Sequence, residues 1–311
     1  MSASGLPQLQ LTVVGTGAMA CLFGARLASV AGVTLTGSWS DGIEAVRTRG
    51  IVVGDPPDCI SVPVSASLWG STIPRADLAL VLVKSWRTPE IARLLDDLLK
   101  PDGIALTLQN GLGNREIFGA RACLGVTYQG ATLLGPGHVR PGGSGPTWIA
   151  GPEWVAGLFR RAGIEAGLRA TAELDALAWG KLAVNCGINA VTALLRVPNG
   201  ELLHRPDATE LIERAATECA QVARAKGIEL PFADPAAKTR EVAKMTAVNY
   251  SSMLQDVLRG APTEVEAING SVVRWGESLG VPTPVNATLL RLVRALECGA
   301  GAPHSKAPFG R

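Results

Sequence analysis

A glycine-rich turn near the N-terminus constrains the fold more than any other feature of this 311-residue chain. The apolar run 9–14 before it predicts a strand, and segment 21–30 after it has apolar residues at helical spacing. The six residues between them match the G-x-G-x-x-A form of the dinucleotide-binding fingerprint: Gly15, Thr16, Gly17, Ala18, Met19 and Ala20. A plain structural turn is the alternative. The strand–turn–helix order favours a site that holds a pyrophosphate on backbone N–H groups.

Strands and helices alternate beyond this turn. The continuous apolar run 77–83 is typical of a strand buried on both faces of a parallel sheet, and segment 88–99 has the spacing of an amphipathic helix. This alternation predicts a doubly wound α/β domain. The Gly- and Thr-rich segment 125–150 is expected to add antiparallel strands that close the same sheet.

The second half of the chain is helical in pattern. Four segments have helical periodicity: 172–195, 207–226, 234–258 and 263–279. We therefore expect two domains, which the length also favours. These are a Rossmann-type dinucleotide-binding domain over 1–171 and an all-α substrate and catalytic domain over 172–311, with the active site between the halves.

Composition excludes several classes of function. The 29 Lys and Arg residues nearly balance 27 Asp and Glu, and no basic tract stands out, so we expect no nucleic-acid partner. The three histidines, His138, His204 and His304, are too scattered for a His-based metal site or a Ser-His-Asp triad, and no metal is expected. Proton transfer is therefore expected from a lysine or a carboxylate.

The six cysteines contain no C-x-x-C pair, and the N-terminus has no basic region followed by an apolar one. No stretch has the length and apolar character needed to span a bilayer. These features predict a cytoplasmic protein with reduced thiols and no membrane partner.

A polar stripe interrupts the most apolar helical segment. Lys181, Asn185 and Asn189 stand at i, i+4 and i+8, so they form one row on a helix that is otherwise apolar. A solvent-facing stripe is the ordinary interpretation. Two amides with one lysine instead suggest fixed hydrogen bonds in a lined cleft. A lysine there could anchor a carboxylate, or act as a general acid with a pKa lowered by desolvation.

A second polar cluster follows at Asn249, Ser252, Asp256 and Glu264. Ser252 and Asp256 share a helix face. Thr263 and Glu266 could form a capping box at a helix start, and Glu264 would then only favour that helix terminus. The pattern alone leaves both interpretations open.

These segments resemble the ketopantoate reductase (2-dehydropantoate 2-reductase) family. The resemblance runs from the glycine turn to about residue 285. It is most specific in KLAVNCGIN at 181–189 and VPNGEL at 197–202, with SSMLQD at 251–256, Thr263–Glu264 and ING at 268–270. It implies reduction of ketopantoate to (R)-pantoate with NADPH, in the pathway to pantothenate and coenzyme A.

The resemblance also implies roles for single residues. Lys181 falls on the general acid, and Glu264 on a second essential residue near substrate and nicotinamide ribose. The substrate-pocket positions fall on Asn110, Asn185, Asn189, Asn199, Asn249 and Ser252. The cofactor positions fall on residues 15–20, Ser40, Lys84, Asn110, Ala131 and Glu264.

The choice between NADP and NAD stays open. Segment 33–36 is predicted to be the second strand, and residues 37–41, Gly-Ser-Trp-Ser-Asp, follow it. Ser40 stands near the place where the family usually has an arginine. The serine hydroxyls could bind a 2′-phosphate and Arg47 could reach it, whereas Asp41 would oppose it. NADPH is the expected cofactor, with NAD as the alternative.

Other functions remain to be weighed. A related reductase of another branched 2-keto acid would share the same acid machinery. A non-catalytic dinucleotide sensor would be free to lose Lys181 and Glu264, which are both present. The β-hydroxyacid dehydrogenases pair similar domains, but the series Asn185, Asn189 and Asn199 matches ketopantoate reductases better. The expected partner is a small 2-keto acid, and the sequence leaves a homodimer open.

Overall fold

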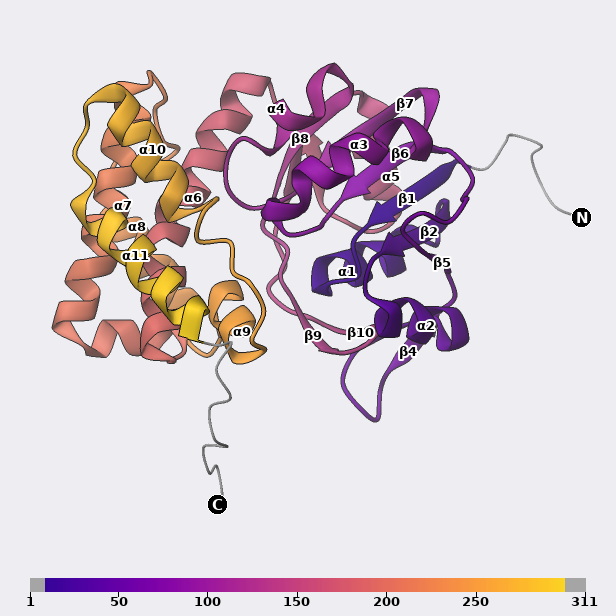
Figure 1. Ribbon diagram of the computed structural model, residues 1–311, viewed down its shortest axis with the longest axis horizontal. Coiled ribbons are helices and arrows are strands. Elements are labelled where there is room, and N and C mark those ends of the chain that lie inside the picture. The colour runs from indigo at the N-terminus through magenta and orange to yellow at the C-terminus, as the bar shows by residue number, and fades with distance from the viewer. Residues whose placement is uncertain (1–8, 300–311) are drawn as a thin grey trace, which may run out of the picture. The chain divides into compact units, whose positions relative to one another are not determined.

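The computed structural model describes residues 9–299 of the chain (Figure 1). These residues form two compact units. The first contains the chain up to residue 109 together with 113–174, and the second contains 110–112 together with the chain from residue 175 onward. The chain passes from the first unit to the second within the long helix α6 (Thr171–Leu195), between residues 174 and 175.

The first unit is built on an eight-stranded sheet with the order β12-β11-β8-β7-β6-β1-β2-β5. Its strands are β1 (Gln10–Val14), β2 (Gly32–Gly37), β5 (Ser65–Leu68), β6 (Ala76–Val81), β7 (Leu99–Thr107), β8 (Ala122–Thr127), β11 (Thr147–Ala150) and β12 (Ala166–Leu168). Neighbouring strands are parallel except for β8 and β11. This confirms the α/β prediction.

Helices cover both faces of this sheet. They are α1 (Ala18–Leu27), α2 (Ser40–Arg49), α3 (Thr88–Leu98), α4 (Asn114–Phe118) and α5 (Glu153–Arg161), with short 3-10 turns η1 (Ser85–Arg87) and η2 (Gly119–Arg121). Successive residues of β1 show the alternation: Val13 packs in one core with residues of α1 and α5, and Val14 in another with residues of α3. Both side chains are fully buried, as expected of a central parallel strand.

A second, smaller sheet has the order β4-β3-β10-β9. Its strands are β3 (Ile51–Val53), β4 (Ile60–Val62), β9 (Ala131–Gly135) and β10 (His138–Pro141). The expectation that segment 125–150 closes the main sheet is therefore right for β11 and wrong for β9 and β10. The reason is non-local: β10 pairs with β3, and both β9 and β10 pack against α1.

The second unit is helical. After α6 come η3 (Asn199–His204), α7 (Pro206–Ala225), α8 (Pro235–Met245), α9 (Ser252–Leu258), α10 (Asn269–Leu279) and α11 (Pro284–Gly299). Segment 234–258, which has helical periodicity in the sequence, contains two separate helices, α8 and α9. The Ser251 side chain accepts a hydrogen bond from the Leu254 backbone N–H and so begins α9 as a new helix. Regular helix after residue 263 begins only at Asn269.

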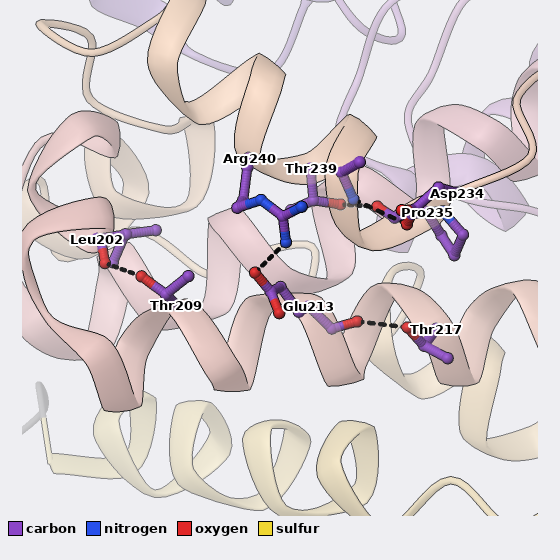
Figure 2. Close-up of polar contacts among 9 residues, drawn as sticks. Leu202, Thr209, Glu213, Thr217, Asp234, Pro235, Thr239 and Arg240 are labelled. Carbon is purple, nitrogen blue, oxygen red and sulfur yellow. Dashed lines mark hydrogen bonds and ion pairs between the residues drawn. The ribbon is translucent and has the colours of Figure 1, made fainter.

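Side-chain hydrogen bonds fix the helices around α7 (Figure 2). The Thr209 hydroxyl near the start of α7 donates to the Leu202 carbonyl of η3 at 2.8 Å, and Arg240 of α8 pairs with Glu213 of α7. Asp234 caps α8 by accepting from the Ala237 N–H at 2.9 Å. The first two contacts therefore connect η3 and α8 to α7.

A buried network stabilises the start of α11. The Glu218 carboxylate of α7 accepts hydrogen bonds from the backbone N–H groups of Val285 and Asn286 at 2.8 and 2.9 Å. Asn286 in turn accepts from the Asn269 side-chain amide at 3.0 Å. A carboxylate at a helix N-terminus is electrostatically favourable, so this buried charge is compensated.

Candidate active site

The glycine turn has the conformation that the fingerprint requires. Gly15 adopts a φ of +132°, which a side chain would strain, and a Cβ there would lie 3.1 Å from the Leu82 carbonyl oxygen. Its N–H donates to the Thr36 carbonyl at 2.8 Å. Gly17 is different, because it is exposed and a Cβ there would have no atom within 4 Å. The surface at Gly17 is therefore open to a ligand.

The N-terminus of α1 is suited to an anion. Gly17 is its N-cap and has no side chain to bond the first backbone N–H groups, which belong to Ala18, Met19 and Ala20. The first turn of α1 carries no acidic residue. Orphan N–H groups and the positive end of the helix dipole favour a phosphate at this point. The residues present therefore fit the pyrophosphate of a dinucleotide.

Three of the other expected cofactor positions, Ser40, Lys84 and Ala131, lie in the same unit as the glycine turn, whereas Asn110 and Glu264 belong to the second unit. Ser40 begins α2 and is exposed, and its hydroxyl donates to the Asp41 carboxylate at 3.2 Å. Lys84 precedes η1 and Ala131 begins β9, and both are half-buried. Arg47 donates from Nε to the Ala66 carbonyl of β5 at 2.9 Å, so part of its guanidinium is held on the backbone of that strand.

Arg87, the last residue of η1, is a candidate site residue that the sequence pattern did not predict. Its Nη1 donates to the hydroxyl of Ser38, which directly follows β2. The only signal for it in the sequence is the adjacent pair Trp86–Arg87 shortly after the buried strand β6. That pair gives no indication of contact with a residue 49 positions away.

The polar stripe lies on the most buried helix of the second unit. Lys181 and Asn185 of α6 are half-buried and Asn189 is only 5% exposed, while Leu182 and Ile188 beside them belong to the hydrophobic core. The stripe is therefore not a solvent-facing row along its whole length. Polar groups in such surroundings need fixed partners or a ligand.

Lys181 has an altered proton affinity. Burial lowers its pKa from 10.5 to about 8, because the surroundings disfavour the charged ammonium, and the nearby Glu264 carboxylate partly opposes this by raising it. Glu264 is 6% exposed. A lysine and a carboxylate thus act on each other inside the helical unit, which is the arrangement expected of an acid that works near neutral pH.

Asn110 belongs to the same group. It lies in the segment 110–112, which packs with the helical unit, and its side-chain amide donates to Glu264 Oε2 at 3.5 Å. Gly111 follows with a φ of +82°, and a Cβ there would lie 2.5 Å from the Ala267 carbonyl oxygen. Only glycine permits this approach, so Gly111 fixes Asn110 beside Glu264.

Asn199 and Asn249 are brought together by a backbone contact. The Asn199 N–H donates to the Asn249 carbonyl at 3.0 Å, and its side-chain amide donates to the Thr246 hydroxyl at 2.9 Å. Asn199 Oδ1 is buried and has no hydrogen-bond partner among the residues described. Asn249 itself is exposed. The pair thus presents one buried amide oxygen and one accessible amide.

Ser252 begins α9 and is half-buried. The preceding Ser251 hydroxyl lies 2.7 Å from the Thr192 hydroxyl, which joins the start of α9 to α6. Asp256 pairs with Arg259, with 3.3 Å between the carboxylate and the guanidinium. The start of α9 and the polar helix α6 are therefore neighbours, although about 60 residues separate Thr192 from Ser251.

The alternative of a capping box at residue 263 is wrong. Thr263 Oγ1 accepts from the Val265 N–H at 3.2 Å, but the Glu266 carboxylate pairs with Arg294 and Arg274. The Arg294 hydrogen bond is the chief cause that holds the pKa of Glu266 below its usual range. Glu264, the other carboxylate of this turn, is the one buried near Lys181.

No cluster of three or more His, Cys, Asp or Glu side chains within residues 9–299 could hold a metal ion. None of the described helices has both the length and the apolar character to cross a membrane.

Comparison with solved structures places the fold among known oxidoreductases. A PanE/ApbA family ketopantoate reductase from Ralstonia eutropha is 31% identical, with a TM-score of 0.86 over 94% of this chain and 100% of its own. D-mandelate dehydrogenase, solved with NADH and anilino(oxo)acetate, is 25% identical, with a TM-score of 0.88 over the same shares of the two chains.

Comparison with sequences gives the family. The 2-dehydropantoate 2-reductase of Archaeoglobus fulgidus is 41% identical over 72% of this chain and 78% of its own, and that of Halobacterium salinarum is 38% identical over 92% and 98%. Family models described as ketopantoate reductase PanE/ApbA and its C-terminal part match residues 11–153 and 173–297. With the glycine turn in one unit and the lysine–glutamate pair in the other, these matches show that the chain belongs to the ketopantoate reductase family.

Proposed function

We propose that this protein reduces 2-dehydropantoate to (R)-pantoate with NADPH, in the pathway to pantothenate and coenzyme A, and that Lys181 is the general acid. The observation that carries the proposal is the lowered pKa of Lys181, about 8, beside the buried Glu264. Membership of the family and the dinucleotide-binding turn are consistent with it. The identity of the keto acid and the preference for NADPH are proposals.

The chemistry needs a cation at the substrate oxygen. When bound on the glycine turn, the dinucleotide supplies the hydrogen and electron pair that the carbonyl carbon receives. Negative charge then develops on the carbonyl oxygen. Lys181 stabilises that charge as an ammonium group and transfers a proton from Nζ to the oxygen, which leaves a neutral amine to be reprotonated from solvent.

Glu264 adjusts the acid. Its carboxylate raises the pKa of Lys181 against the opposing effect of burial, and so keeps part of the lysine protonated near neutral pH. Asn110 donates to Glu264 and holds that carboxylate in place. As the resemblance implies, we also assign Glu264 to the nicotinamide ribose, and Asn110 to a contact with both cofactor and substrate.

Neutral amides and a hydroxyl are assigned to the substrate. Asn185 and Asn189 continue the row that Lys181 begins on α6, and Ser252 at the start of α9 adds a hydroxyl. Asn199 Oδ1, which has no hydrogen-bond partner within the described part of the chain, is assigned as an acceptor for a substrate hydroxyl. These groups bind a 2-keto acid without adding a titrating group that would compete with Lys181 for protons.

The direct test is turnover. Purified protein is mixed with 2-dehydropantoate and either NADPH or NADH, and the loss of the nicotinamide absorbance is followed. We expect turnover with NADPH and stereospecific formation of (R)-pantoate. No turnover with either cofactor, in protein that still binds a dinucleotide, would refute the proposed reaction.

A second candidate is reduction of another branched 2-keto acid. The similarity to D-mandelate dehydrogenase supports this second candidate, because the structure of that enzyme was solved with NADH and anilino(oxo)acetate. The same acid would serve, and only the groups around the substrate side chain would differ. A panel of 2-keto acids decides between the two: ketopantoate should give the highest kcat/KM, and a better substrate in the panel would replace it.

We also propose a cytoplasmic homodimer. All six cysteines are free thiols, which suits a reducing compartment. In the helical unit, Met245, Val248 and Leu258 are large apolar side chains that are 67%, 89% and 55% exposed, and a partner copy could cover them. Light scattering on the full chain should give twice the monomer mass; a monomer at the concentration used in the assay would exclude the dimer.

A further inference from the structure

We propose that Arg87 and Ser38 bind the 2′-phosphate of NADPH, so that the cation that selects NADP comes from the segment after β6 instead of from the end of β2. This inference rests on the proposed use of a dinucleotide at the glycine turn. It names residues of this chain that determine cofactor choice. No arginine stands directly after β2, where residues 38–41 are Ser, Trp, Ser and Asp.

Ser38 lies just beyond the end of β2, where the adenosine ribose of a dinucleotide is expected. In a doubly wound sheet of this kind, the residues just beyond the second strand lie at the ribose of the adenosine, and there an acidic group selects NAD or an arginine accommodates the 2′-phosphate. Ser38 directly follows β2 and is exposed. The neighbouring β2 residue Gly37 lies against the fingerprint itself, since a Cβ at Gly37 would be 2.6 Å from Thr16.

Arg87 points its guanidinium at this position. Its Nη1 donates a hydrogen bond to Ser38 Oγ. Because the serine oxygen is the acceptor in that bond, its own O–H remains available to donate to a phosphate oxygen. The two residues therefore offer a charged donor and a neutral donor side by side, which is the combination that a phosphate monoester prefers.

Two tryptophans hold the guanidinium in position. The central carbon of Arg87 lies 4.0 Å from the ring centroid of Trp69, which follows β5, and 5.5 Å from that of Trp86. The Trp69 backbone N–H is itself fixed to the Gly37 carbonyl at 3.0 Å. Stacking on an indole restrains an arginine while leaving its edge free to bond, so the site is ordered before a ligand arrives.

Glu90 sets the strength of the site. Its carboxylate, in the first turn of α3, pairs with Nε and Nη2 of Arg87 at 3.1 and 3.0 Å. This ion pair orients the guanidinium and leaves Nη1 directed to Ser38. It also offsets part of the positive charge, so removal of the carboxylate should strengthen binding of an anion.

Neighbouring groups are less suited to the same task. Arg47 is bonded to the Ala66 carbonyl and lies 4.0 Å from Glu44. The Ser40 hydroxyl donates to Asp41, which would oppose a phosphate. Among the described residues around the end of β2, Arg87 is the cation with a bond to the ribose-side serine.

The test measures binding by calorimetry and does not depend on turnover. The full-length protein is titrated with adenosine 2′,5′-bisphosphate and with 5′-AMP, and then with NADPH and NADH. Three variants are compared: Arg87→Gln, Glu90→Gln, and the control Arg93→Gln, which removes the same charge from an exposed position on α3.

Loss of a charge-assisted bond predicts about 10- to 100-fold weaker binding of the bisphosphate and of NADPH to Arg87→Gln. Binding of 5′-AMP and NADH should stay within about twofold, which also shows that the variant is folded. Glu90→Gln should bind NADPH a few-fold more tightly, and Arg93→Gln should match the wild type. Equal weakening of NADPH and NADH in Arg87→Gln, or no change in either, would overturn the assignment.

If Arg87→Gln fails to fold, Ser38→Ala provides the second test, because Ser38 is exposed and its hydroxyl is small. It should weaken NADPH but not NADH. The outcomes also separate this inference from the proposed reaction. Arg87-dependent binding of the bisphosphate without reduction of ketopantoate refutes the reaction alone. If the protein reduces ketopantoate but Arg87→Gln binds the bisphosphate and NADPH as tightly as the wild type, only the 2′-phosphate site is refuted.

Discussion

The glycine turn and the lysine-bearing helix α6 differ in the chemical groups that they offer to a ligand. The turn offers backbone N–H groups at an open surface around Gly17, and nothing in residues 15–20 titrates near neutral pH. Helix α6 offers side chains in largely buried surroundings, and burial changes the proton affinity of Lys181. Backbone groups suit a ligand part that never changes, the pyrophosphate, whereas the reacting carbonyl needs a group whose charge can change.

The largest effect should come from the side-chain region. Lys181→Ala removes the proposed acid, so kcat should fall by about two to four orders of magnitude, the usual contribution of a general acid. Calorimetry should show that NADPH binding is kept within a few-fold, because the glycine turn is intact. Lys244→Ala, at an exposed position on α8, is the matched control. A near-normal kcat for Lys181→Ala would exclude Lys181 as the general acid. An equal loss of NADPH binding would show that Lys181 also contributes to cofactor binding, so that the two regions do not have separate functions.

Two glycine substitutions should separate binding from folding at the turn. Gly17→Ala leaves the backbone relaxed and meets no atom of the protein, so its unfolding free energy should change little. The new methyl group crowds the pyrophosphate, and dinucleotide binding should weaken by about 1–3 kcal/mol. Gly15→Ala forces a side chain into a φ of +132° and should reduce the unfolding free energy by about 1–3 kcal/mol. Urea denaturation and calorimetry on both variants check this; a destabilised Gly17→Ala with normal binding would contradict it.

The two regions also differ in how far the sequence predicts them. The turn is local: residues 9–30 contain the strand, the glycines and the helix, so spacing alone indicates its conformation. The same holds for Lys181, Asn185 and Asn189, because one helix spaces them. The residues that surround this row come from distant parts of the chain. Asn110 depends on Gly111 approaching Ala267, a contact that no periodicity shows.

Errors in the predicted elements have the same origin. Segment 234–258 has helical spacing throughout, but residues 246–251 leave the helix and place the Asn249 carbonyl on the Asn199 N–H. Strands β9 and β10 join β3 and β4 in a sheet of their own because distant partners complete their hydrogen bonds. Arg87 is the clearest case, since its partner Ser38 lies on another element and the intervening chain gives no sign of it.

The pH dependence should locate the titrating region. Protonated Lys181 is the active form, so kcat/KM should be constant below a pKa of about 8 and then fall about tenfold per pH unit above it. Glu264→Gln removes the carboxylate that raises this pKa, so the decline should begin at lower pH. Initial rates between pH 6 and 10 measure both profiles. If kcat/KM of Glu264→Gln begins to fall at the same pH as that of the wild type, Glu264 does not act on the titrating group. The Gly17→Ala variant should show the wild-type pH profile.

The smallest effect should come from adding the arginine that the family usually has after the second strand. Ser40 begins α2, is exposed, and donates its hydroxyl to Asp41. Ser40→Arg places a cation near the 2′-phosphate, but Asp41 offsets it, and a cation in the first turn of a helix is disfavoured by about 0.3–1 kcal/mol. If Arg87 already binds the phosphate, the NADPH/NADH ratio of kcat/KM should rise only a few-fold in the wild-type background. In Arg87→Gln the same substitution should restore a larger part of the lost preference, because the two cations then no longer share one anion. Equal gains in both backgrounds would show that Ser40 and Arg87 act on separate ligand groups.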